Sequence, residues 1–174
     1  MGAMTMSYPT TSWAGFAAAE PAFADYAQDR FRRYRHHVLA TLRQDGSPRV
    51  TPLEVNFLSG ELWLGMMPES RKALDLRRDP RFSVQANPGP GEDLTEGDVR
   101  VSGRAVEVTD PGTLARFAEE VHPPEPFHLF RAEVTEVVHT ALEDGRMVLR
   151  TWRPGQPVRV LRPGGDDTPP GAEG

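Results

Sequence analysis

The feature that most constrains the fold is a change of hydrophobic period at Val38. From Val38 onward apolar and polar residues alternate, as in strands, and Asp45-Gly46, Ser59-Gly60 and Asp144-Gly145 are typical hairpin turns. The segments between turns predict strands at Val38–Arg43, Arg49–Phe57, Glu61–Met67, Arg81–Ala86, Asp98–Thr109, Phe127–Leu142, Met147–Arg153 and, more weakly, Val158–Leu161. We therefore expect a mainly β fold, a small barrel or sandwich of about six or seven mostly antiparallel strands.

Two residues inside these strands predict local irregularities. Pro52 has no N–H to donate, so its strand must lie at a sheet edge or carry a bulge there. The apolar phase of the strand Asp98–Thr109 slips at Gly103, which indicates a β-bulge. The first three strands are expected to form a meander.

About three helices are expected among the strands. Phe23, Tyr26, Phe31 and their neighbours recur at helical spacing, which predicts a helix over Pro21–Tyr34. Ser70 and Asp110 are good N-caps for helices over 71–78 and from 110 to about 121. Residues 1–20 are expected to form a flexible N-terminal segment, residues 21–162 a single domain, and residues 163–174 a disordered tail.

Ser70, Arg71 and Lys72 form the one candidate binding site that local chemistry indicates. Lys72 is the only lysine in the chain. Free N–H groups, the positive end of the helix dipole and two cations converge at this helix start, and together they suit a phosphate. The alternative, which local physics favours, is a short surface helix with a solvated basic face.

Composition excludes several classes of function. The chain has 174 residues, a formal net charge of −5 and no cysteine, so disulfides, thiolate catalysis and cysteine-ligated metals are excluded. The five histidines show no metal-ligand spacing, and no metal site is predicted. The acidic total argues against nucleic acid, although the segment Arg30–His37 is basic and aromatic. No apolar run could span a membrane, and a cytoplasmic protein is expected.

Three segments in serial order resemble the pyridoxamine 5′-phosphate oxidase-like, FMN-binding split-barrel family. They read VLATLRQDGSPRVTPLEV, GELWLGMMPESRKALDLRRDPRFSV and VRVSGRAVEVTDP, and they cover roughly residues 38–111. The resemblance implies a split β-barrel and a homodimer with FMN in a cleft at the subunit interface. Because the chain shows no evident acid, base or nucleophile, a cofactor that carries the reaction fits it well.

The resemblance also implies the residues that would contact the flavin. Arg71 and Lys72 would hold its phosphate, with Ser70 at the helix start. The second hairpin strand would lie along the ring, and the third strand would end beside the flavin or its ribityl chain. The expected contacts there are Val50, Thr51, Pro52, Leu53, Met66 and Met67. Asp98 stands where the family can carry a glutamine that touches the flavin, and Met66 stands where a hydroxyl residue is frequent.

Other departures concern the substrate. The family's basic residue for substrate phosphate is matched by Val55 or Glu54, and its Arg-Leu-His-Asp-Arg signature is replaced by Arg150-Thr-Trp-Arg-Pro-Gly155. Oxidation of vitamin B6 is therefore not expected. Trp63, Trp152 and Met66 are candidates to shape the cavity, though each is more often core.

The resemblance implies an FMN-dependent oxidoreductase that transfers hydride between flavin and an unidentified small molecule. The first alternative is a deazaflavin-dependent reductase. The second is a non-enzymatic flavin or haem carrier or sensor on the same fold, with His36, His37 or His139 as candidate haem ligands. The third is a nucleic-acid-binding protein that uses Arg30–His37.

Overall fold

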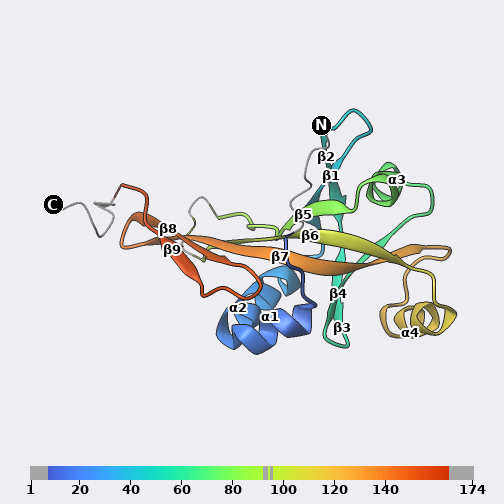
Figure 1. Ribbon diagram of the computed structural model, residues 1–174, viewed down its shortest axis with the longest axis horizontal. Coiled ribbons are helices and arrows are strands. Elements are labelled where there is room, and N and C mark those ends of the chain that lie inside the picture. Colours follow the sequence, from blue (N-terminus) through green and yellow to red (C-terminus); the bar gives the residue numbers. More distant parts are fainter. Residues whose placement is uncertain (1–7, 92–93, 95, 165–174) are drawn as a thin grey trace.

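The structure is a computed structural model that describes residues 8–91, 94 and 96–164 (Figure 1). Its helices are α1 (Trp13–Ala19), α2 (Pro21–Arg32), α3 (Arg71–Arg78) and α4 (Pro111–Val121). Its strands are β1 (His37–Leu42), β2 (Pro48–Leu53), β3 (Val55–Leu58), β4 (Glu61–Met66), β5 (Arg81–Gln85), β6 (Asp98–Val108), β7 (His128–Glu143), β8 (Arg146–Trp152) and β9 (Arg159–Leu161). In this described part, no helix is long and apolar enough to cross a membrane.

All strands belong to one antiparallel sheet, which confirms the mainly β prediction. The strand order is β2-β1-β5-β6-β7-β4-β3, and β8 pairs with both β7 and β9. The long strand β7 changes partners along its length: residues 128–131 pair with β4, whereas residues 137–143 pair with β8. β7 thus joins two parts of one sheet, which does not close into a barrel among the described strands.

The strand expected over Arg49–Phe57 is in fact two strands, so the expected meander is wrong. The strand is interrupted at Glu54. The half before it, β2, pairs with β1, and the half after it, β3, pairs with β4. The two halves thus lie at opposite ends of the strand order. With this interruption, the part of the chain that the structure describes has nine strands, and Pro52 lies in the edge strand β2 next to a change of chain direction.

The predicted turns and the predicted bulge are confirmed. Ser59-Gly60 and Asp144-Gly145 have positive φ at both positions, as hairpins that continue the strand twist require. The register of β6 on β7 shifts between Ser102 and Gly103. A Cβ atom at Gly103 would lie 2.0 Å from the carbonyl oxygen of Glu133, so only glycine fits at this bulge.

Helices α1 and α2 cover one side of the sheet, and α3 lies on the other (Figure 1). Residues 13–19, which the sequence places in a flexible segment, instead form α1, capped by Ser12 and anchored by the buried side chains of Trp13 and Phe16. These aromatic rings join the main core with Phe31, Leu62 and Val101. The described residues therefore form four helices, one more than expected.

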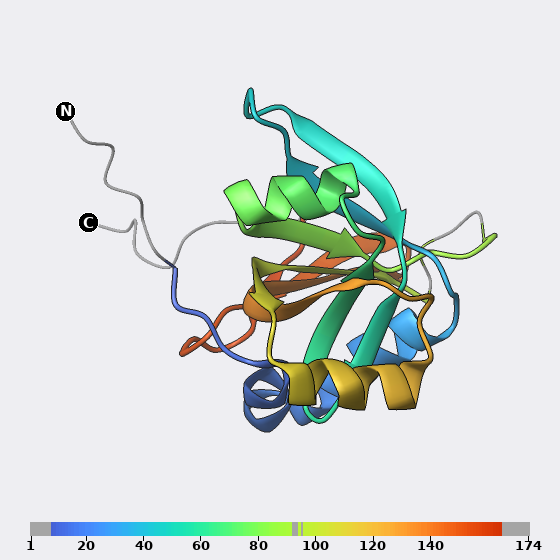
Figure 2. The same cartoon turned by 90° about the vertical axis from the view of Figure 1, so that its right-hand side faces the viewer.

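Helix α4 forms a separate, smaller cluster. Phe117 packs with Trp63 of β4 and Leu129 of β7, and Val121 and Phe127 pack around them. Figure 2 shows α4 (gold) at the side of the molecule away from α3, where it lies crosswise to the teal strands β3 and β4. The helix thus stands as a wall beside the end of β4.

Candidate functional site

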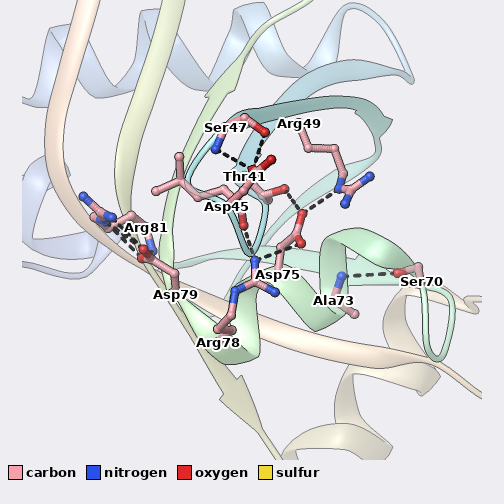
Figure 3. Close-up of polar contacts among 11 residues, drawn as sticks. Thr41, Asp45, Ser47, Arg49, Ser70, Ala73, Asp75, Arg78, Asp79 and Arg81 are labelled. Atoms are coloured by element: carbon pink, nitrogen blue, oxygen red, sulfur yellow. Dashed lines mark hydrogen bonds and ion pairs between the residues drawn. The ribbon is translucent and has the colours of Figure 1, made fainter.

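The start of α3 has the geometry that its sequence predicts. The Ser70 hydroxyl accepts a hydrogen bond from the N–H of Ala73 at 3.4 Å, which is the contact of an N-cap (Figure 3). At the other end, Asp79 is extended and precedes Pro80, so the helix stops there. Arg71 and Lys72 therefore occupy the first turn, where the helix dipole is positive.

Lys72 meets the proline-marked strand. Its amino group donates a hydrogen bond to the carbonyl oxygen of Pro52 at 2.8 Å. Burial lowers the pKa of Lys72 below its usual value, because a charged ammonium loses hydration there. Lys72 thus links the start of α3 to the edge strand β2, although Lys72 and Pro52 are twenty residues apart in the chain.

A cavity of about 450 Å³ opens beside this contact. Five of the predicted cofactor-binding residues line it: Pro52, Leu53, Met66, Met67 and Lys72. The other lining residues are Arg35, His36, Glu54, Asn56, Gly65, Phe117, Val121, His122, Pro123, Pro124 and Phe127. The volume lies in the range of roughly 300–1,000 Å³ that is common for small-molecule sites.

The far wall of this cavity was missed by sequence reasoning. Phe117, Val121 and Phe127 come from α4 and the connector that follows it, and His122 caps the helix in a left-handed conformation. The only available signal was a proline-rich connector flanked by aromatic residues. No local pattern links that connector to Lys72, about fifty residues earlier, because tertiary packing alone brings them together.

The rim contains Arg35 and His36, from the connector between α2 and β1. The sequence offered His36 as a haem ligand and both residues as part of a basic patch. Arg35 Nε instead donates to Glu54 Oε1 at 2.7 Å, and His36 Nε2 lies 3.5 Å from the same oxygen. Glu54, at which the strand is interrupted, thus contacts two basic residues of the cavity lining.

Arg71 lines a second cavity, of about 530 Å³, on the other side of the α3 start. Its walls are Arg43, Gln44, Asp45, Arg49, Arg71, Leu74, Asp75 and Arg78. Four guanidinium groups face two carboxylates there, so the walls carry a surplus of positive charge. Arg71 and Lys72 are neighbours in sequence, yet they point into two different cavities.

The remaining predicted contacts lie outside both cavities. Val50 is 65% exposed on the outer face of β2. Thr51 turns inward, and its hydroxyl oxygen is buried with no hydrogen-bond partner among the described residues. Asp98 begins β6 and accepts a hydrogen bond from Gln85, so the structure does not bring it to Lys72.

The other candidates from the sequence are dispersed. His37 is buried, and its Nδ1 accepts a hydrogen bond from the N–H of Asn87 at 3.0 Å, while His139 packs against Tyr26. Trp152 lies in the main core and Trp63 behind the α4 wall, so neither lines the cavity. Within the described ranges, no cluster of three metal-ligating side chains occurs.

Two arginines of the basic segment Arg30–His37 are paired with carboxylates. Arg30 is buried and forms an ion pair with Glu96 at 3.0 Å. Arg33 forms ion pairs with Asp29 and with Glu96 at 3.0 and 2.7 Å. These pairs reduce the positive charge that this end of α2 could offer to a nucleic-acid backbone.

Comparisons with known proteins identify the fold and the family of this chain. The family model described as pyridoxamine 5′-phosphate oxidase matches residues 8–141. A conserved hypothetical protein from Mycobacterium tuberculosis is 27% identical, with 68% of this chain and 81% of that chain covered at a TM-score of 0.54. A comparison with curated protein sequences found no match.

Two further solved structures share the fold. A pyridoxamine 5′-phosphate oxidase-related, FMN-binding protein from Nostoc punctiforme is 17% identical, with 82% and 95% of the two chains covered and a TM-score of 0.59. PhzG from Burkholderia lata is 16% identical, with 84% and 90% covered and a TM-score of 0.54. Since the family model spans most of the sequence, this chain belongs to the pyridoxamine 5′-phosphate oxidase family.

Proposed function

We propose that this protein binds FMN and acts as an oxidoreductase on a small molecule. The observation that carries the proposal is the position of Lys72, whose amino group lies on the Pro52 carbonyl at the edge of a largely apolar cavity. FMN has a flat, largely apolar ring and a charged phosphate, so its binding site needs a cation next to an apolar cavity. The arginine-lined cavity on the other side of the helix start adds further positive charge nearby.

The residues present fit a flavin in two respects. Leu53, Met66 and Phe117 supply apolar surface for a planar ligand. Ser70 orients the first turn of α3, so that its free N–H groups and Lys72 act together on an anion.

When bound, FMN would supply the hydride chemistry, which no side chain of this cavity provides. Lys72 would hold the phosphate, because its partly buried ammonium gains from a nearby anion. The backbone of residues 50–53 would lie along the ring. Phe117 and Phe127 would exclude water from the reacting face, and the substrate would enter between them and the rim.

The proposal includes a homodimer. Val38, Val50 and Pro52 share the outer face of β1 and β2, and the two valines are among the exposed large apolar residues. A second copy would cover this face and the open side of the cavity. Light scattering during size-exclusion chromatography should give twice the mass of one chain, and Val50→Asp should lower it; a monomeric wild-type protein would contradict the dimer.

The direct test is the visible spectrum of the purified protein, with the mass of any released ligand. We expect a flavin spectrum and FMN, either bound or taken up. The double variant Arg71→Ala, Lys72→Ala should lose uptake while its circular dichroism stays that of a folded β protein. A matched control, Arg146→Ala in β8, should bind normally. A protein that takes up neither FMN nor deazaflavin would exclude the proposal.

Two alternatives are resolved by the same spectrum. A deazaflavin would also be accommodated by positive charge around α3, and its mass identifies it. A haem carrier is favoured by His36 at the cavity rim, and HutZ, a haem storage protein from Vibrio cholerae, shares the fold at a TM-score of 0.50. A Soret band that disappears in His36→Ala would support haem.

A further inference from the structure

The rim of the Lys72 cavity carries an arginine whose hydrogen-bonding capacity is only partly used. Arg35 Nε donates to Glu54, while its two terminal nitrogens have no hydrogen-bond partner in the part of the chain that the structure describes. The side chain is 77% exposed, at the mouth of the cavity. A guanidinium held through Nε presents its outer N–H groups in a fixed direction.

The contact with Glu54 fixes Arg35 without cancelling the positive charge of the site. Arg35 and Lys72 are the two cations among the lining residues, and Glu54 is the single carboxylate. His36 lies 3.5 Å from the same Glu54 oxygen, so that oxygen is shared between two basic groups. An oxyanion at the mouth therefore meets a net positive field.

Another part of the cavity lining is apolar. It consists of Phe117, Val121 and Phe127 from the α4 side, together with Pro123 and Pro124. A ligand that contacts both parts of the lining needs an apolar body and a group that accepts hydrogen bonds from Arg35. A planar acid has both parts.

We propose that the cavity selects substrates that carry a carboxylate on an apolar, planar body, with Arg35 binding the carboxylate and Glu54 positioning Arg35. The assignment of these ligands as substrates rests on the proposed function; their binding does not. Bidentate pairing of a guanidinium with a carboxylate gives both direction and energy to this contact. Lys72 remains with the cofactor phosphate, and the α4 wall covers the body of the substrate.

The test is calorimetric titration of the purified full chain, as it is isolated, with benzoate and with its neutral isostere benzamide. Benzoate should bind at least roughly tenfold more tightly, since a hydrogen bond between two charged groups is stronger than one to a neutral amide. Arg35→Gln should abolish this preference, and Arg35→Lys should retain part of it, because the charge stays while the fork is lost. Arg32→Gln, a matched change at an exposed residue of α2 outside the cavity, should keep the preference.

Equal affinity for the two probes, no binding of either at millimolar concentration, or a preference that survives Arg35→Gln would overturn the proposal. The visible spectrum of each preparation separates this outcome from the proposed function. A flavin-loaded protein without benzoate preference rejects only the carboxylate site. A benzoate preference that depends on Arg35 in a protein that takes up no flavin supports the site and rejects the oxidoreductase.

Discussion

Asp75 in α3 and Asp98 at the start of β6 have contrasting surroundings. Their comparison shows how hydrogen-bond partners determine the direction in which the pKa of a buried carboxyl group shifts. Asp75 is 3% exposed and accepts hydrogen bonds from Arg49, Thr41 and Arg78 at 2.6, 2.8 and 3.1 Å (Figure 3). For Asp98, Gln85 donates to one carboxylate oxygen, and the other is buried without a partner among the described residues.

The pKa values of the two carboxyl groups shift in opposite directions. Burial by itself would raise the pKa of Asp75, but hydrogen bonds from Arg49, Thr41 and Arg78 outweigh it and hold that pKa below the usual 3.8. Burial raises the pKa of Asp98 above 3.8, because the contacts with Val99 and Gln85 compensate only in part. Asp75 thus ties α3 to β1 and β2, whereas Asp98 belongs to a poorly satisfied region with the unpartnered Arg30 Nε and His139 Nε2.

Asp75→Ala should have the largest effect on stability. It leaves Arg49 and Arg78 close together without their shared counter-charge, and breaking such a pair costs about 3 kcal/mol when the partners are partly exposed. Urea unfolding followed by circular dichroism measures the change. Asp45→Ala, at an exposed turn, should cost less than about 1 kcal/mol. A loss below 1 kcal/mol for Asp75→Ala would show that the network does not secure α3.

Thr41→Val removes one donor to Asp75 and keeps the side-chain shape. Thr41 is buried, and its hydroxyl donates to Asp75 Oδ2 at 2.8 Å. We expect a loss of about 1.5 kcal/mol, which is the usual contribution of a hydrogen bond to a charged group. In an Asp75→Ala background the same change should cost much less, because its acceptor is gone. Additive losses in this double-mutant cycle would contradict the shared network.

His139 should make the protein less stable in weak acid. Burial lowers the pKa of His139 below 6.5, and Arg150 and Arg30 lower it further while Glu143 opposes them. The unfolded chain therefore binds the proton first, so stability is full above pH 6.5 and declines as pH falls below that value. His139→Gln should reduce the decline between pH 7 and pH 5 by up to about 1 kcal/mol.

A control for this pH dependence is His122→Asn, at an exposed helix cap where asparagine tolerates the left-handed backbone. That variant should keep the wild-type decline. His37 contributes in the same direction, because burial also lowers its pKa, so some decline should remain in His139→Gln. An identical pH profile for His139→Gln and wild type would assign the whole effect elsewhere.

Local chemistry predicts the parts of the fold that depend on few neighbouring residues. The hairpin turns, the Gly103 bulge and the Ser70 cap all follow from the backbone preferences of single residues. The break at Glu54 does not, because residues 49–57 alternate without interruption and only the competing partners β1 and β4 separate them. Helix α1 was missed because its sequence of alanine, glycine and aromatics shows no polar face.

The candidate site likewise has one part that local sequence predicts and another that depends on long-range packing. Ser70, Arg71 and Lys72 predict positive charge at the start of α3, and Pro52 predicts an edge strand or a bulge. The structure joins the two features through the hydrogen bond from Lys72 to Pro52. Arg35 and the α4 wall could not be predicted, since long-range packing alone places them at the cavity. The direction of Arg71 into a different cavity from Lys72 follows from the roughly 100° rotation per helical residue, which sequence adjacency conceals.

Asp98→Asn should have the smallest effect, and its sign is the sharpest test of the comparison. The raised pKa means that ionised Asp98 is less favourable in the folded chain than in the unfolded one. Its contribution to stability is therefore present below pH 3.8 and is lost as pH rises through the folded pKa. The neutral amide avoids that loss, so the variant should match or exceed wild-type stability at pH 7, within about 1 kcal/mol, and show no gain at pH 3.

The matched change Asp75→Asn should lose stability at pH 7, because the amide replaces the anion that two arginines and Thr41 require. If Asp98→Asn instead costs as much as Asp75→Asn, the two carboxylates are equally well paired and the contrast fails. Flavin affinity of the same Asp98 variant tests the remaining sequence prediction. A changed affinity would support contact between Asp98 and the cofactor. An unchanged affinity would show that Asp98 acts only within the buried region that it shares with Arg30 and His139.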